Sequence, residues 1–168
     1  MEQPVKSDSH ESRAAKIFRE IFESGRPLTY VRSAEEQRVA KVLHEAGHNL
    51  FDSTPVPVWT WSLTEGLRCE GGAPEANVQG ARGALDFIAG HKDPAIFHLK
   101  DFHEPLRDFP DVRRRLRDLY EVCLDQRKFV VISSPVRFVP EEVERDLVYV
   151  DLPLPDQVEL GDFVREEA

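Results

Sequence analysis

The sequence predicts an α/β fold, a doubly wound and mostly parallel sheet of five strands with helices on both faces. Short runs rich in β-branched and aromatic residues alternate with longer stretches in which apolar residues recur every three or four positions. Two of the short runs are strongly apolar, residues 95–99 with one histidine and residues 129–132 throughout, which is typical of strands covered on both faces. We therefore expect these two strands in the middle of the sheet, with right-handed crossovers between parallel neighbours.

The first predicted element is an amphipathic helix over residues 10–24, which Gly25 ends. Its apolar residues lie three and four positions apart, at Ala14, Ile17, Phe18, Ile21 and Phe22. A short strand is expected next, at residues 28–31. Ser33 and Glu36 then match a capping box, which opens a second helix.

The same patterns predict the rest of the chain. Strands are expected at residues 56–63, 95–99, 129–132 and 147–152, helices at 81–89 and 111–124, one helical turn at 141–144, and a glycine-rich loop at 66–80. We divide the chain into a tail and helix at residues 1–26, one α/β domain at 27–160 and a C-terminal tail at 161–168. A length of 168 residues and a hydrophobic content of 40% suit a single core.

The composition narrows the classes of partner. A formal net charge of −9 argues against a surface for nucleic acid or an anionic membrane, because both are negatively charged. Arg113, Arg114, Arg115 and Arg117 form a basic cluster, but the aspartates around them indicate a solvated helix face. The two cysteines form no CxxC pair, and no apolar run suits a signal peptide or a membrane span. We therefore expect a cytoplasmic protein.

The connection after the first strand lacks a phosphate-binding loop. Such a loop, GxxxxGK[ST], stands between the first strand and its helix because backbone amides and the lysine must both reach the phosphates. Residues 30–38 contain neither glycine nor lysine. Glu35 and Glu36 instead stand in the first helical turn, where the positive helix end would attract a phosphate. The sequence indicates an ordinary capped helix here.

Asp101 follows the central strand, the place where α/β nucleotide-binding sheets hold a metal-binding aspartate. The next residue is Phe102, not the acidic residue that would activate a water molecule. Ser33 and Ser134 follow other strands and could orient a phosphate, although serines at strand ends usually bond the backbone. Asp101, Ser33 and Ser134 are therefore the candidate residues of a weak site for ATP and magnesium.

The segment His44-Glu45-Ala46-Gly47-His48 matches the HExxH motif. In zinc proteases the two histidines bind the metal and the glutamate acts as a base. No HxxGxxH extension follows, and no nearby helix carries a glutamate that would be the third ligand. His44 and His48 lie nearly opposite the apolar stripe of the helix, as solvent-facing residues do. We expect no metal here, and keep a zinc hydrolase as an alternative.

A resemblance to a known family rests on six stretches taken together. They are Leu28–Glu36, Val58–Leu67, Ala84–Ile88, Pro94–His103, Lys128–Pro135 and Glu144–Asp156. In their order and spacing they resemble an AAA-type ATPase family of cyanobacteria, plastids and other bacteria. The likeness is to the N-terminal half of that family, a degenerate AAA domain without a phosphate-binding loop, and it covers about residues 27–160.

In that family a second AAA domain follows and carries the intact nucleotide site. The resemblance implies an AAA-like core without a lid, which has no catalytic residues and no cofactor and serves interaction or regulation. The expected partner is an AAA ATPase subunit or a second copy of the chain, because AAA domains pack side by side. A weak ATP-binding AAA-type ATPase and a zinc metallohydrolase remain the alternatives.

Overall fold

A computed structural model describes residues 11–50, 54–76, 78, 80–124 and 126–167. The strands are β1 (Leu28–Arg32), β2 (Val58–Ser62), β3 (Gly66–Cys69), β4 (Ala95–Lys100), β5 (Lys128–Ser134) and β6 (Leu147–Asp151). The helices are α1 (Arg13–Glu23), α2 (Glu36–His48), α3 (Ala81–Gly90), α4 (His103–Asp108), α5 (Pro110–Leu124) and α6 (Gln157–Glu167), with a 3-10 turn, η3, at Glu141–Val143. The tail expected before residue 11 lies outside the described residues.

The predicted α/β fold is confirmed, with one strand more than expected. The strands form a six-stranded sheet in the order β3-β2-β4-β5-β1-β6. Strands β2, β4, β5, β1 and β6 pair in parallel, and only β3 runs antiparallel, against β2. The two strongly apolar runs became β4 and β5, which occupy the centre as predicted.

The loop predicted at residues 66–80 begins with strand β3, so this prediction was wrong for its first residues. Only Leu67 of β3 is a buried apolar residue, and so four residues gave too short a pattern to predict a strand. The strand forms because the chain turns back directly after β2 and pairs with it. Its outer edge is covered by the following loop, where Glu75 N–H donates to the Leu67 carbonyl at 2.8 Å.

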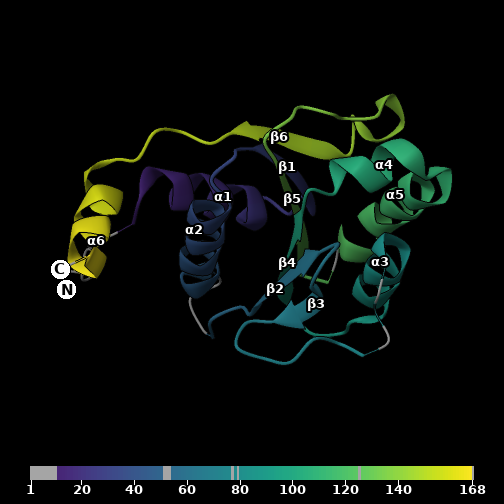
Figure 1. Cartoon of the computed structure of the whole chain (residues 1–168), viewed down its shortest axis with the longest axis horizontal. Coiled ribbons are helices and arrows are strands. Elements are labelled where there is room, and N and C mark those ends of the chain that lie inside the picture. The colour runs from purple at the N-terminus through teal and green to yellow at the C-terminus, as the bar shows by residue number, and fades with distance from the viewer. Residues whose placement is uncertain (1–10, 51–53, 77, 79, 125, 168) are drawn as a thin grey trace, which may run out of the picture.

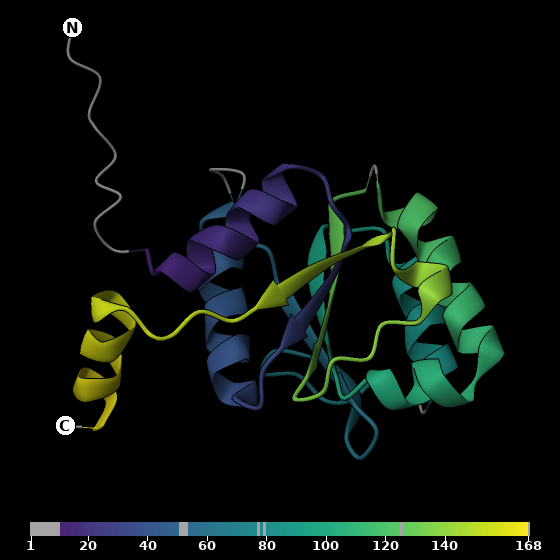
Figure 2. The same ribbon diagram turned by 90° about the horizontal axis from the view of Figure 1, so that it is seen from above.

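Helices cover both faces of the sheet (Figures 1 and 2). One apolar core lies between the sheet and α1 and α2, and the other between the sheet and α3 and α5. Strand β4 contributes to both, since Phe97 faces one core and Ile96 the other, each with 0% exposure. Helix α1 is part of the first core, where the Phe22 ring stacks on Phe129 with centroids 4.6 Å apart.

Helices α4 and α6 were not predicted from the sequence. Residues 161–167, which we assigned to a tail, lie in α6 (Figure 2). Polar contacts hold this helix to the rest of the chain. Arg38 of α2 donates to both carboxylate oxygens of Glu159, at 2.8 and 3.1 Å, and Asp156 accepts from Arg13 N–H at 2.7 Å. No helix in the described part of the chain is both long and apolar enough to cross a membrane.

A buried lysine joins β5 to the end of α3. Lys128 has 0% exposure, and its Nζ donates to the carbonyls of Ile88 at 2.6 Å and His91 at 2.7 Å. These carbonyls belong to the last turn and C-cap of α3, where helical acceptors lack the usual amide four residues on, and the Ile88 carbonyl also accepts from His91 N–H at 3.3 Å. Burial lowers the pKa of Lys128. The lysine therefore fixes the C-terminal end of α3 to a central strand.

Candidate functional site

Ser33, Asp101 and Ser134 stand at or just after the carboxyl ends of β1, β4 and β5, so all three lie at the same end of the parallel strands. Ser33 N–H donates to the Ser134 carbonyl at 2.9 Å, and Asp101 N–H donates to the Ser133 carbonyl at 2.9 Å. The three residues named as candidates for a nucleotide site are thus neighbours. The carboxyl end of the strands is where ligands bind in open parallel sheets.

The hydroxyls of both serines are used by local turns. Ser33 Oγ accepts from Glu35 N–H at 3.0 Å, and Ser134 Oγ accepts from Val136 N–H at 3.0 Å. The predicted capping box is therefore wrong: Ser33 caps nothing, α2 begins at Glu36, and its N-cap Glu35 makes no side-chain capping bond. The Ser33 hydroxyl accepts from the amide of Glu35, two residues later, and not from the amide of Glu36, three residues later, which a capping box requires.

Carboxylates stand at the start of α2, where a phosphate would otherwise bind. Glu36 lies in the first turn, and the Lys100 amine is 3.9 Å from its carboxylate. Arg38, the nearest arginine of α2, is paired with Glu35 and Glu159. Lys100 and Arg38 therefore face the chain's own carboxylates. An incoming phosphate would meet negative charge at the positive end of the helix.

Asp101 has an unusual backbone. Its φ of +53° lies in the left-handed region, which few non-glycine residues adopt. Its carboxylate is exposed and makes no hydrogen bond or ion pair with any described residue. The following residue, Phe102, is buried in the core. Asp101 thus has no bonded partner among the described side chains, and the described residues include no group of three or more His, Cys, Asp or Glu side chains that could hold a metal ion.

A buried histidine lies close behind these strand ends, and no sequence pattern indicated its role. His98 has 0% exposure, and its Nε2 is 2.7 Å from Ser133 Oγ. Burial, with the charge of Lys100 as a smaller cause, lowers the pKa of His98 to about 3. The imidazole is therefore neutral at physiological pH. Because His98 and Ser133 are both buried, this pair is part of the core and offers no exposed nucleophile.

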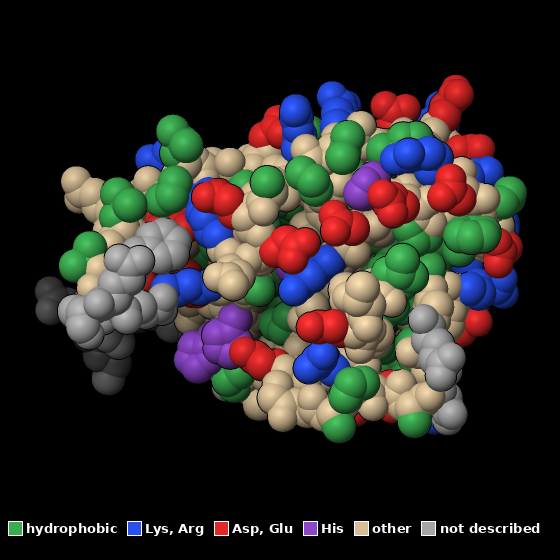
Figure 3. Space-filling model, in the orientation of Figure 1, with side chains coloured by type: hydrophobic (Ala, Val, Ile, Leu, Met, Phe, Trp, Pro, Cys, Tyr) green, Lys and Arg blue, Asp and Glu red, His purple; other side chains and the backbone are tan. Residues whose placement is uncertain are grey.

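The HExxH segment lies on α2, with its two histidines at the surface and Glu45 bonded to Ser12. His44 and His48 are exposed, and histidines are visible at the surface near one end of α2 in Figure 3. His44 Nδ1 lies 2.9 Å from the Glu70 carboxylate. Glu45 instead accepts from the backbone N–H and hydroxyl of Ser12, which caps α1, and burial raises the pKa of Glu45. Glu45 therefore serves the contact between α1 and α2, and nothing observed supports a zinc hydrolase.

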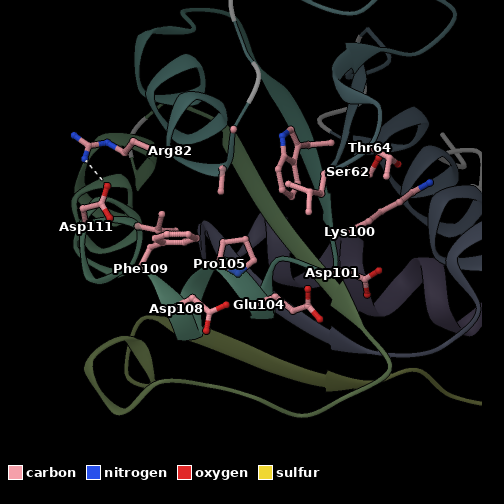
Figure 4. A pocket seen from close by; sticks show the side chains of 15 residues that line it. Ser62, Thr64, Arg82, Lys100, Asp101, Glu104, Pro105, Asp108, Phe109 and Asp111 are labelled. Atoms are coloured by element: carbon pink, nitrogen blue, oxygen red, sulfur yellow. Dashed lines mark hydrogen bonds and ion pairs between the residues drawn. The ribbon is translucent and has the colours of Figure 1, made fainter.

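A pocket of about 580 Å³ opens beside Asp101 (Figure 4). It lies between the turn after β2, the N-terminus of α3, and helices α4 and α5. Asp101, Glu104 and Asp108 follow one another along one side, and Arg82 pairs with Asp111 at 3.4 Å. Sequence reasoning missed this pocket because its walls come from separate segments. The one signal was the spacing of the three acidic residues, which places them on one side of α4 and of the turn before it.

These features define an AAA-like domain, with the sheet of a nucleotide-binding fold and carboxylates in place of a phosphate-binding loop. Residues 14–152 match the family model described as "SpoVK-like AAA ATPase, N-terminal domain". The chain belongs to this family. The match includes most of α1, which the resemblance seen in the sequence left out, and it ends before α6.

Two relatives extend this likeness to algae. The chain is 30% identical over 150 residues to the AAA domain-containing protein ycf46 of Guillardia theta, covering 86% of this chain and 28% of that protein. It is 27% identical over 148 residues to the ycf46 protein of Pyropia yezoensis, covering 85% of this chain and 29% of that protein. The chain thus spans less than a third of the length of the curated relatives it matches.

Proposed function

We propose that this chain is a non-catalytic, regulatory AAA-like domain that assembles with an AAA ATPase subunit or with a second copy of itself. The observation that carries the proposal is the junction of β1 and α2. There the Ser33 amide and hydroxyl are bonded within the chain, and Glu35 and Glu36 stand where a phosphate would bind. A domain without a phosphate site can still present its surfaces to another AAA domain.

The first test measures nucleotide binding. Thermal unfolding of the purified chain is followed with and without millimolar ATP and magnesium. ATP at a hundred times its dissociation constant would add roughly 2.7 kcal/mol to the stability of the fold. We expect no ATP-specific rise in the melting temperature. A clear rise, absent with magnesium alone, would refute the absence of a nucleotide site on which the proposal rests.

The second test measures assembly. The tagged chain is purified from its source organism, and any AAA ATPase recovered with it is produced separately and mixed with the purified chain. Light scattering after size exclusion then gives the mass of the chain alone and of the mixture. We expect either a complex of defined stoichiometry with the ATPase or a defined oligomer of the chain. A monomer in both samples would refute the proposal.

Asp101 supports one alternative, a weak ATP-binding domain. Its exposed carboxylate stands at the end of a central strand, in a left-handed backbone conformation of the strained kind found at functional sites. Calorimetric titration of ATP into the wild type and Asp101→Asn distinguishes the two functions. Magnesium-dependent heat in the wild type that is lost in the variant would establish the alternative. We expect no such heat in either protein.

A further inference from the structure

The pocket beside Asp101 combines apolar walls with exposed apolar side chains. Trp61, Ala81, Pro105 and Val112 contribute apolar surface to its lining. Leu63 and Phe109 also line it, and they remain 70% and 54% exposed. Large apolar side chains exposed together are typical of surfaces that bind another molecule. A bound molecule could therefore contact apolar side chains both inside the pocket and at its rim, at Leu63 and Phe109.

One side of this pocket carries negative charge without a counter-ion. The exposed carboxylates of Asp101, Glu104 and Asp108 make no hydrogen bond or ion pair with any described residue (Figure 4). The cations in the lining are already engaged: Arg82 pairs with Asp86 and Asp111, and Lys100 lies near Glu36. A ligand that complements the pocket therefore carries positive charge next to apolar groups, and a phosphate or other anion does not fit.

We infer that this pocket binds a segment of a partner protein in which arginine or lysine side chains alternate with large apolar ones. This inference rests on the proposed interaction function and names the chemistry of the partner. The cations would pair with the three carboxylates. The apolar side chains would cover Leu63 and Phe109, and an arginine could also stack on the Phe109 ring.

Two other sources of positive charge fit less well. A small organic cation such as a polyamine would satisfy the carboxylates but would leave Leu63 and Phe109 uncovered. A second copy of this chain would have to offer the basic cluster of α5. Three of its four arginines are paired with carboxylates within the described chain: Arg113 with Glu142, Arg114 with Asp118, and Arg115 with Asp86 and Asp118. This leaves Arg117 as one cation of the cluster for three carboxylates.

The test uses Trp61 as a fluorescent reporter, because it lines the pocket. Trp59 is the other tryptophan of the chain, and replacing it leaves Trp61 as the source of tryptophan emission. In a Trp59→Phe background, Trp61 emission is followed while a capped heptapeptide of alternating leucine and arginine is added at low salt. We expect a saturable change for this peptide and none for its leucine–glutamate counterpart. Binding should weaken as salt rises, because exposed charges are then screened.

The carboxylates are tested by a triple variant, Asp101→Asn with Glu104→Gln and Asp108→Asn. Asparagine tolerates the left-handed backbone at position 101, so the fold should be kept, and circular dichroism checks this. We expect peptide affinity to fall at least tenfold, roughly the effect of 1.4 kcal/mol. The matched control changes three exposed carboxylates that do not line the pocket, with Glu121→Gln, Glu141→Gln and Glu144→Gln. This control should change affinity less than about twofold, since distant exposed charges interact weakly in salt.

The apolar rim is tested by Leu63→Ser combined with Phe109→Ser. This variant should also bind the peptide at least tenfold more weakly, while any binding of spermidine is unchanged. Equal losses in the pocket triple variant and its control would show that only net charge matters, and would overturn the inference. Spermidine binding as tight as that of the peptide would assign the pocket to a small cation instead, which also overturns it.

The outcome is separable from that of the proposed function. A wild type that forms its complex but does not bind the peptide refutes the pocket and leaves the interaction function standing. A wild type that forms neither complex nor oligomer refutes the interaction function, whatever the peptide does. If the pocket triple variant loses the complex while the control variant keeps it, both the interaction function and the role of the pocket are supported.

Discussion

Replacing Lys128 by methionine tests whether the buried lysine holds α3 in place. Methionine has a similar length and no charge, so it fills the space without donating hydrogen bonds. The change removes two close bonds, from Nζ to the Ile88 and His91 carbonyls at 2.6 and 2.7 Å. It also removes a favourable positive charge at the C-terminal end of the helix.

The expected magnitude follows from two opposing effects. A hydrogen bond from a charged donor contributes about 1.5 to 3 kcal/mol, so two of them give roughly 3 to 6. Against this, the variant no longer buries a charge, and the lowered pKa of Lys128 shows that this burial is unfavourable. We expect a net loss of about 2 to 4 kcal/mol in the free energy of unfolding. A domain of this size has about 5 to 15 kcal/mol in all, so the variant should fold but be markedly weakened.

Urea unfolding followed by tryptophan fluorescence measures this loss. Lys92→Met is the matched control, because Lys92 is exposed and makes no hydrogen bond or ion pair with any described residue. It should change the free energy of unfolding by less than about 0.5 kcal/mol. A loss for Lys128→Met as small as that of the control would refute the assignment, since the α3 carbonyls would then need no donor from β5.

Two further predictions concern the core. Phe97 has 0% exposure and packs against the rings of Trp59 and Phe87, so Phe97→Ala should cost about 3 to 5 kcal/mol in urea unfolding. Phe109→Ala, at an exposed phenylalanine, is its control, and equal effects would contradict the central position of β4. His98, with a folded pKa of about 3, stays neutral when the unfolded chain takes up a proton below pH 6.5. Stability should therefore fall as pH falls from 6.5 toward 3, by up to about 1.4 kcal/mol per pH unit more than in His98→Gln. Parallel pH profiles of the two proteins would show that His98 titrates normally.

The centre of the sheet could be predicted because burial on both faces leaves a direct mark on the sequence. Residues 129–132 are all apolar and residues 95–99 are apolar except for His98, with no polar alternation, as is typical of central strands. The helices facing the two cores were predictable for a similar reason, since their apolar stripes follow the helical period. Strand β3 and helix α4 were missed because each is too short to complete such a pattern.

The pocket and the buried polar contacts depend on contacts that sequence periodicity does not encode. Lys128 stands in an apolar strand and donates to carbonyls of a helix that precedes β4. The sequence at Ser33 matches a capping box. In the structure, however, its N–H donates to the Ser134 carbonyl of β5 and its hydroxyl accepts from Glu35 N–H, so the helix begins later. Asp101 could be placed at the end of a strand, whereas the walls around it come from three other parts of the chain.

The two edges of the sheet differ in a way that limits how the sheet can grow. At β3 the Leu67 carbonyl is occupied by the amide of Glu75, so a returning loop blocks that edge. At the opposite side of the sheet, β6 pairs with β1 and with no other described strand. Among the described strands, β6 is therefore the one at which a strand from another molecule could extend the sheet. If two copies met there, a two-fold axis would use both open edges at once, and the joined sheet would end in a blocked β3 on each side. Edge pairing of this chain would stop at two molecules and could not continue into a fibre.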